Sequence, residues 1–428
     1  MTPGAAAARA AYSTLLRLAT PLYLARLWWR GAREPLYRAA LAERLGFVAP
    51  QPPGRLWIHA VSLGETRAAA ALIEALRLAR PELKLLLTHG TATGRAAGAA
   101  LLREGDAQCW LPYDTPGAVR RFLDRHRPAA GVLMETEVWP NLARAAAVHG
   151  LPLVLANARL SERSLRKGLR LAALMRPAAA AITRALAQTE DDAVRLRAIG
   201  VRDVVVTGNL KYDMTPAPAL LERGRAWRRA LGRPVVLAAS TREGEETPLL
   251  AAWGALPAPR PLLLLVPRHP QRFDAVAALA AQAGFTTARR SAFGDMPPVD
   301  AAALDVWLGD SMGEMPLYFA LADVALLGGS FAPLGGQNLI EAAACGCPVV
   351  MGPHTFNFAQ ASELALAAGA AERVVGVEAG VRRAAALAWP EPAGSARAVM
   401  ARHALDFAAA HRGAALRVAR GVLAAVAD

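Results

Sequence analysis

Glu65 is a candidate proton acceptor because of its place in the sequence. It is the last residue of Ser62-Leu63-Gly64-Glu65, which follows an apolar run over residues 55–61 and opens a helical pattern over residues 66–79. A carboxylate kept ionised by a helix N-terminus can take the proton of a substrate hydroxyl. The same residues match the capping box, in which Ser62 and Glu65 only satisfy the first amides of the helix. The spacing leaves both interpretations open.

Two further carboxylates follow the apolar run over residues 131–134. Glu135 and Glu137 stand two residues apart, so an extended chain would point them to opposite faces. We therefore do not expect them to act as a pair on one atom. One of them is expected to face a cleft and the other to cap the helix that begins near Pro140. Which of the two faces the cleft stays open.

Glycines gather around a predicted helix start in the second half of the chain. The segment Gly328 to Ala344 has a double glycine after an apolar run and a second one, Gly335-Gly336, before a helical pattern. Unobstructed amides and a helix N-terminus suit a phosphate, and the downstream Glu341 suits the hydroxyls of a ribose. Alternatively, the glycines allow close packing and Glu341 complements the helix dipole. The chain has no Walker lysine and no G-x-G-x-x-G at a first βα turn, which argues against an NTPase or a dehydrogenase.

Basic residues also follow predicted strands. Lys211 comes after the run over residues 204–207, and Arg268-His269 comes after the run over residues 261–266. Such groups can stabilise the charge that develops on a leaving phosphate or hold a sugar carboxylate. Solvated surface charge is the alternative, and it is less expected at the end of an apolar strand.

The strands and helices that position these residues are predicted to form two α/β halves. Short apolar runs alternate with helical stretches, which is typical of βαβ units around a parallel sheet. Two such halves would leave a cleft at the carboxyl ends of their strands, where ligands of these folds bind. Strands are expected at 55–61, 83–88, 131–134, 151–156 and 204–207 in the first half, and at 234–239, 261–266, 305–308, 324–327 and 348–351 in the second, before an Ala-rich terminal helix at 399–426.

The N-terminal segment Ala11 to Trp29 is mostly apolar but contains Arg17, Pro21 and Arg26. A basic, Trp-bearing flank follows it, which favours a helix that lies on or is shallowly anchored in a membrane surface. The alternative is a core helix that docks on the first domain through Leu15, Leu18, Leu22 and Leu27.

Composition limits the classes of partner. The chain has 428 residues, enough for two cores, and a net charge of +14, so its surface attracts anions. Its three cysteines, Cys109, Cys345 and Cys347, make neither a disulfide framework nor a zinc site, which fits a reducing compartment. Nucleic acid is not expected, because the basic residues lack interleaved aromatics and no RNA-binding motif is present.

Taken together, the motifs resemble those of the 3-deoxy-D-manno-octulosonic acid (Kdo) transferases of lipopolysaccharide core synthesis. The resemblance covers nearly the whole chain, and Leu63 replaces a valine that is common in the family. The motifs that carry it are Arg30-Gly31 to Glu43-Arg44, His59 to Glu65, Met134 to Asn141, Gly208 to Asp213, Val266 to Pro270, Met312-Gly313-Glu314 and Gly328 to Glu341.

The resemblance implies an inverting GT-B glycosyltransferase, an α/β protein of two Rossmann-like doubly wound domains that face a central cleft. It would move Kdo from CMP-Kdo to a lipid A precursor of the lipid IVA type, at the cytoplasmic face of the inner membrane. The alternative is a non-catalytic nucleotide- or lipid-binding protein that retains this fold. The domains expected are an N-terminal membrane helix at 1–35, an acceptor domain at 36–213, a linker at 214–233, a donor domain at 234–400 and a helix at 401–428 that returns to the acceptor domain.

The resemblance also implies roles for single residues. Glu65 would be the general base, and Glu135 and Lys211 would support the transition state. No metal or other cofactor is expected, because basic groups and helix amides would hold the leaving phosphate and no Asp-x-Asp pair is present. The residues expected to bind the donor are Arg268, His269, Met312, Gly313, Glu314, Ser330, Gly335, Gly336, Asn338, Leu339, Ile340 and Glu341.

Overall fold

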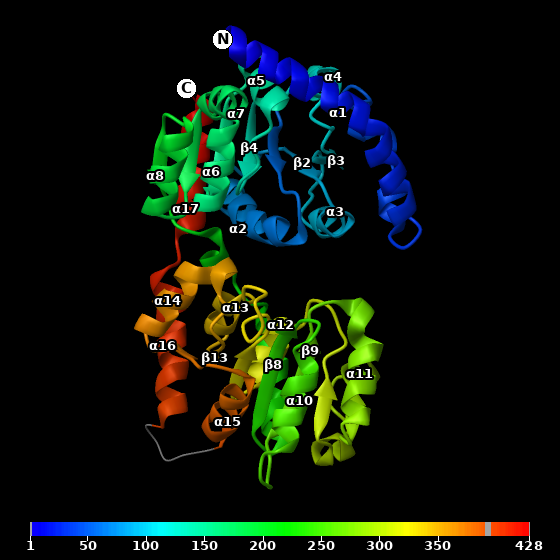
Figure 1. Ribbon diagram of the computed structural model, residues 1–428, viewed down its shortest axis with the longest axis vertical. Coiled ribbons are helices and arrows are strands. Elements are labelled where there is room, and N and C mark those ends of the chain that lie inside the picture. The colour runs from blue at the N-terminus through cyan, green and yellow to red at the C-terminus, as the bar shows by residue number, and fades with distance from the viewer. Residues whose placement is uncertain (1, 390–394, 428) are drawn as a thin grey trace. The chain divides into compact units, whose positions relative to one another are not determined.

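The computed structural model describes residues 2–389 and 395–427 (Figure 1). The chain divides into two compact units, one formed by Met1–Asp213 with Arg412–Asp428 and the other by Met214–His411. Each unit is an α/β domain around its own parallel sheet. The prediction of two doubly wound α/β domains is therefore confirmed.

The first unit is built on a sheet in the order β3-β2-β1-β4-β5-β6-β7. Apolar side chains cover both faces of its central strands, which are completely buried, as continuous apolar runs require. Helices α2 and α17 cover one face and α4, α5 and α8 the other. The strands are β1 (Leu56–His59), β2 (Leu85–His89), β3 (Ala107–Trp110), β4 (Ala130–Met134), β5 (Leu153–Ala158), β6 (Arg184–Ala187) and β7 (Val204–Val206). The helices are α1 (Pro3–Arg30), α2 (Leu63–Ala79), α3 (Ala92–Ala99), α4 (Pro116–His126), α5 (Pro140–Val148), α6 (Glu162–Arg170), α7 (Ala172–Ala180), α8 (Glu190–Ile199) and α17 (Ala414–Ala427).

The second unit repeats this plan with the order β10-β11-β9-β8-β12-β13-β14. The central strands β8, β9 and β12 pair in parallel, so their carboxyl ends meet at one edge. The strands are β8 (Val235–Thr241), β9 (Leu262–Pro267), β10 (Thr287–Arg289), β11 (Val306–Leu308), β12 (Val324–Leu327), β13 (Val349–Met351) and β14 (Ala371–Arg373). The helices are α9 (Pro218–Leu231), α10 (Glu246–Gly254), α11 (Phe273–Gln282), α12 (Met315–Leu321), α13 (Leu339–Ala344), α14 (Ala359–Ala367), α15 (Val377–Ala388) and α16 (Ala396–Ala410).

Two expected segments differ from what the structure shows. Most of the expected linker at 214–233 is helix α9, whose Trp227 is completely buried and whose Gly224 lies against the backbone of Leu317 in the second unit. The single terminal helix expected at 399–426 is two helices, α16 in the second unit and α17 in the first (Figure 1). The break falls at Gly413, whose φ of 92° an ordinary helix does not contain. The amides of Gly413 and Ala415 donate to the carboxylate of Asp213, which fixes the start of α17 to the first unit.

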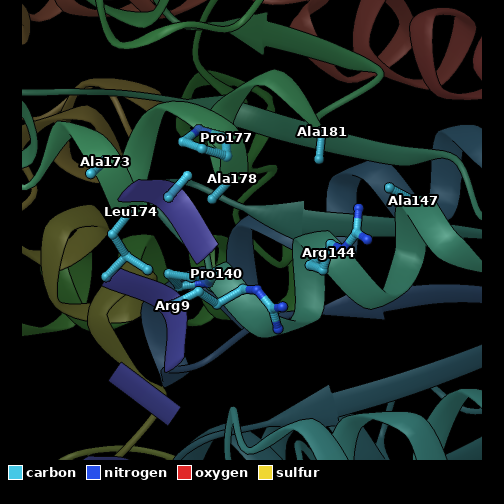
Figure 2. A pocket seen from close by; sticks show the side chains of 10 residues that line it. Arg9, Pro140, Arg144, Ala147, Ala173, Leu174, Pro177, Ala178 and Ala181 are labelled. Atoms are coloured by element: carbon cyan, nitrogen blue, oxygen red, sulfur yellow. The ribbon is translucent and has the colours of Figure 1, made fainter. Parts of the chain in front are cut away.

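Helix α1 packs on the first unit near its N-terminal end. Its Tyr12 and Ser13 hydroxyls donate to Asp114 and Asn141 at 3.1 Å each. Further along the helix, Leu15, Leu18 and Leu22 are at least 65% exposed and do not dock as a core helix would require, whereas Leu27 packs against Tyr37 and Trp110. Ala5 and Arg9 of α1 join residues of α5 and α7 around a pocket of about 210 Å³ (Figure 2). Within the described part of the chain no helix, α1 included, is long and apolar enough to cross a membrane.

Candidate functional site

Glu65 forms the predicted capping box at the start of α2. The Ser62 hydroxyl accepts from the Glu65 amide at 3.4 Å and donates to Glu65 Oε1 at 3.0 Å, while the Val61 amide donates to Glu65 Oε2 at 2.8 Å. Each carboxylate oxygen thus receives one of these bonds and keeps further acceptor capacity. Burial raises the pKa of Glu65, the Val61 amide opposes that shift, and the charge of Glu135 adds to it. A fixed carboxylate with a raised pKa is suited to accept a proton, so capping and base chemistry are compatible here.

Glu135 lies at the end of β4 in a left-handed conformation, with φ of 56°. This backbone turns the chain out of the strand and directs a buried carboxylate toward two cations. Arg159 Nε donates to its Oε2 at 2.8 Å, and Lys211 Nζ lies 3.3 Å from its Oε1. The structure therefore brings together Glu135 and Lys211, which come from separate motifs of the sequence. Because a non-glycine residue in this region is strained, the surrounding contacts must hold it there.

Arg159 is a site residue that the sequence analysis missed. It follows β5 directly, and it shares the Glu135 carboxylate with Lys211. The signal was available, since a basic residue after an apolar strand is the pattern that identified Lys211 and Arg268.

Glu137 is coupled to the other two carboxylates. Burial raises its pKa to about 7, and the charges of Glu65 and Glu135 add to the shift. The chain turns at Glu135 and Thr136, so the extended geometry that would separate the two acids does not apply. Helix α5 has Trp139 as its N-cap residue and no side-chain cap, so the prediction that one of the two acids caps it is wrong.

We expect Glu137→Gln to stabilise the first unit at neutral and alkaline pH. The folded pKa of about 7 lies above the ordinary value of 4.5, so the wild-type protein loses stability as pH rises through this window. The glutamine variant should therefore match wild type below pH 4.5 and gain about 1–3 kcal/mol by pH 8. Chemical denaturation below pH 4.5 and at pH 8 measures the free energy of unfolding of both proteins. Hydrogen exchange then shows whether the change lies in the first unit. Glu74→Gln, at an exposed position of α2, is the control, and an equal gain at both pH values would contradict the assignment.

In the second unit, three amides of the glycine-rich loop after β12 are used within the protein. The Gly328 amide donates to the Ala239 carbonyl at 2.9 Å, and the Gly329 amide donates to Glu245 at 2.6 Å. The Gly336 amide donates to the Gly329 carbonyl at 2.8 Å. A Cβ at Gly328 would lie 2.4 Å from the carbonyl oxygen of Ser240, so close packing explains this glycine. These three amides do not form the phosphate cradle that the sequence suggested.

Several predicted donor residues of this loop have structural partners. Ser330 is completely buried, donates to the Leu327 carbonyl and accepts from the Gly352 amide at 2.9 Å. Gly335 has φ of 90°, and a Cβ there would meet the Asn357 side chain. Asn338 caps α13 by accepting from the Ile340 amide at 3.2 Å. The side chains of Leu339 and Ile340 are buried in the core, so only their backbone is suited to a ligand, and Glu341 lies in the first turn of α13.

The other predicted donor residues lie on more open loops. Arg268 and His269 are exposed just after β9. Met312 is 55% exposed, and Gly313 beside it has φ of 82°. The Glu314 carboxylate pairs with Arg290 at 2.8 Å and accepts from Ser311 at 2.5 Å. Their roles in binding stay predictions.

A second missed segment is Ser240 to Glu246, which comprises the end of β8 and the turn after it. Glu245 and Glu246 are buried, and Glu246 forms two hydrogen bonds with Arg272, at 2.6 and 2.9 Å. Four charged residues directly after an apolar strand were the available signal. Among the described residues, no group of three or more His, Cys, Asp or Glu side chains is arranged to hold a metal ion.

Comparisons with known proteins agree with this geometry. Residues 39–214 match the family model of the 3-deoxy-D-manno-octulosonic-acid transferases. The chain is 50% identical over 424 residues to the 3-deoxy-D-manno-octulosonic acid transferase of Bordetella pertussis, which covers 96% of this chain and 97% of the relative. It is 37% identical to the enzyme of that name from Haemophilus influenzae, over 81% of this chain and 82% of the relative. Among solved structures, Anabaena HepE in complex with UDP superposes with a TM-score of 0.56 at 14% identity, over 87% of this chain and 99% of that one, which supports the fold alone.

Proposed function

Because the chain belongs to the 3-deoxy-D-manno-octulosonic acid transferase family, we propose that it transfers Kdo from CMP-Kdo to a lipid A precursor with inversion. The protein is a glycosyltransferase with two parallel-sheet domains of the GT-B kind. The identity of the donor and acceptor and the roles of single residues are parts of this proposal.

The observation that carries the proposal is the carboxylate of Glu65, fixed by Val61 and Ser62 beside a second carboxylate that is neutralised by cations. In the proposed step the acceptor hydroxyl gives its proton to Glu65 and its oxygen bonds to the anomeric carbon. The bond from that carbon to the phosphate oxygen breaks, and CMP leaves with the electron pair. Cationic side chains can hold the charge that grows on this phosphate.

The Glu135 cluster supports the same step. Its carboxylate holds Lys211 and Arg159 at fixed positions, so these cations need no reorganisation during the reaction. The charge of Glu135 also helps to raise the pKa of Glu65, which makes Glu65 a stronger base.

The direct test is a product assay with purified protein, CMP-Kdo and a tetra-acylated lipid A precursor. Mass spectrometry should show the acceptor increased by at least one Kdo residue, with release of one CMP for each Kdo transferred. Binding of CMP without product would instead identify a nucleotide-binding protein that retains the fold.

For the membrane, we propose that α1 lies on an anionic inner-membrane surface on the cytoplasmic side. Leu15, Leu18, Leu22 and Trp29 recur at helical spacing, and each of them is at least 65% exposed. Exposed arginines of the same segment can add attraction to anionic lipid. The acceptor is an anionic lipid, so docking at this surface would bring the enzyme to its substrate.

The exposed apolar residues of α1 give a prediction. The triple variant Leu18→Ser, Leu22→Ser, Trp29→Ser should bind vesicles of phosphatidylglycerol and phosphatidylethanolamine on the order of a hundredfold more weakly, at roughly 1 kcal/mol for each of the three partly inserted side chains. Sedimentation with vesicles measures this change. Leu78→Ser, at a residue of α2 that is 77% exposed, is the control. Wild-type sedimentation of the triple variant would show that α1 does not dock.

A further inference from the structure

The donor carries more than one anionic group that the protein must bind. In the proposed function, on which this inference rests, the donor carries a phosphodiester and a sugar carboxylate. The amides of Gly328, Gly329 and Gly336 already have partners within the protein. These three amides cannot serve the donor without losing those bonds, and side-chain cations at the carboxyl ends of the strands are the other groups that can bind its charge.

Arg242 lies where three loops of the second unit meet. Its amide and the Gly329 amide both donate to Oε2 of Glu245, at 2.9 and 2.6 Å, so one carboxylate oxygen joins the loops after β8 and β12. The Arg268 amide donates to the Thr241 carbonyl at 2.9 Å, which joins the loop after β9 to the same place. The backbone of Arg242 is thus adjacent to both segments from which the donor site was predicted.

The turn that carries Arg242 is firmly held. Glu245 is 4% exposed and Glu246 is 1% exposed. Glu246 binds Arg272 through both of its oxygens and accepts from the Thr241 hydroxyl at 2.8 Å. Ser240 before it has φ of 58°, a strained conformation that such contacts maintain. Fixed backbone of this kind limits the positions that the attached side chain can reach.

The guanidinium of Arg242 has no hydrogen bond or ion pair within the described residues. Its backbone amide and carbonyl, in contrast, both form hydrogen bonds with Glu245. Arg242 is half-buried, and its charge and that of Arg268 both act on His269, whose pKa is lowered first by burial and then by these cations. Arg242 and Arg268 therefore act on the same imidazole. The carboxylates of Glu245 and Glu246 in this turn are already engaged, by backbone amides and by Arg272.

We propose that Arg242 is a donor-binding residue whose guanidinium contacts an anionic group of the nucleotide sugar beside Arg268. An arginine suits either group, because its planar donors match the oxygens of a phosphate and of a carboxylate. The buried pair Glu245 and Glu246 holds the turn that presents it.

The test measures CMP affinity by calorimetry and the KM for CMP-Kdo in Arg242→Ala, Arg242→Lys and Arg229→Ala. Arg229 is an exposed arginine on α9 and serves as the matched control. Loss of a charge-assisted bond should raise the affected constant by about tenfold to a hundredfold, and lysine should restore part of it. A weaker CMP affinity would identify the phosphate as the partner, whereas unchanged CMP affinity with a raised KM for CMP-Kdo would identify the sugar carboxylate.

The proposal is overturned if CMP affinity and the KM for the donor both stay within twofold of wild type, as expected for Arg229→Ala. If the wild-type protein still transfers Kdo in that experiment, only the role of Arg242 is overturned and the proposed function stands. A wild-type protein that neither binds CMP nor forms product would overturn both. If Arg242→Ala unfolds early in a thermal scan, the comparison of Arg242→Lys with wild type decides the question, because lysine keeps the charge but not the planar pair of donors.

Discussion

Glu65→Gln is expected to reduce the rate of Kdo transfer by about a hundredfold to ten-thousandfold, the range that general bases contribute. The amide keeps the shape of the carboxylate, and its oxygen can still accept from the Val61 amide. It cannot take the proton of the acceptor hydroxyl. Single-turnover kinetics with saturating donor should show the loss in the chemical step, while CMP affinity stays at the wild-type level.

Ser62→Ala is the matched control for the capping role of Glu65. It removes the hydroxyl that bonds Glu65 and the N-cap of α2 but keeps the carboxylate. It should cost about 1 kcal/mol of stability and only a small part of the rate. Near-wild-type turnover in Glu65→Gln, or equal losses in the two variants, would reduce Glu65 to a capping residue.

The pH dependence of the rate provides a second measurement on the same group. Burial and the charge of Glu135 raise the pKa of Glu65, so the base becomes active only as pH rises through that raised value. Glu135→Gln removes that neighbouring negative charge and should shift the acidic limb of the profile to lower pH. An unchanged limb in that variant would mean that the limb reports another group.

The central strands could be predicted from the sequence because parallel sheets bury them on both faces. The runs that became β1, β2, β4, β8 and β9 are mostly apolar, and each overlaps its expected range. Strands β3, β6, β10 and β14 were missed. Three of them, β3, β10 and β14, form edges of their sheets and are only partly buried. Strand β6 lies inside its sheet but is a short run that begins with Arg184. Their mixed sequences lack the continuous apolar run that marks a central strand.

The carboxylate cluster could be located from the sequence but not arranged. Strand ends indicated Glu65, Glu135 and Lys211. The relation of Glu135 to Glu137 depends on the left-handed conformation of Glu135. A glutamate in a sequence gives no sign of that conformation, which glycine adopts far more readily. An assumed extended chain therefore separated two acids that are electrostatically coupled in the folded protein.

The hydrogen bonds of the glycine-rich loop could not be predicted from the sequence. Its composition suggested amides free for a phosphate, but hydrogen bonding within a loop is invisible in a sequence. Glu245 takes the Gly329 amide from a position 84 residues earlier in the chain, which local patterns cannot reveal. Which amides of the loop stay open to a ligand therefore depends on contacts from distant parts of the chain.

Lys211→Met is expected to lower kcat by about a hundredfold to a thousandfold, as does the loss of one donor that stabilises transition-state charge. The KM for CMP-Kdo should change only a few-fold, because the interaction strengthens as charge develops on the phosphate. The fold should survive, since Arg159 still pairs with Glu135 at 2.8 Å when Lys211 is removed. Steady-state kinetics together with thermal unfolding separate these effects.

A double-mutant cycle with Glu135→Gln decides how Lys211 acts. If Lys211 only balances the charge of Glu135, removing both charges should restore much of the rate that Lys211→Met loses. If Lys211 stabilises the transition state directly, Glu135→Gln should slow the reaction by misplacing the lysine, and the double variant should be at least as slow as Lys211→Met. We expect the second outcome, because Arg159 donates to Glu135 at 2.8 Å and can neutralise that carboxylate without Lys211. Recovery of the rate in the double variant would assign Lys211 to the support of Glu135.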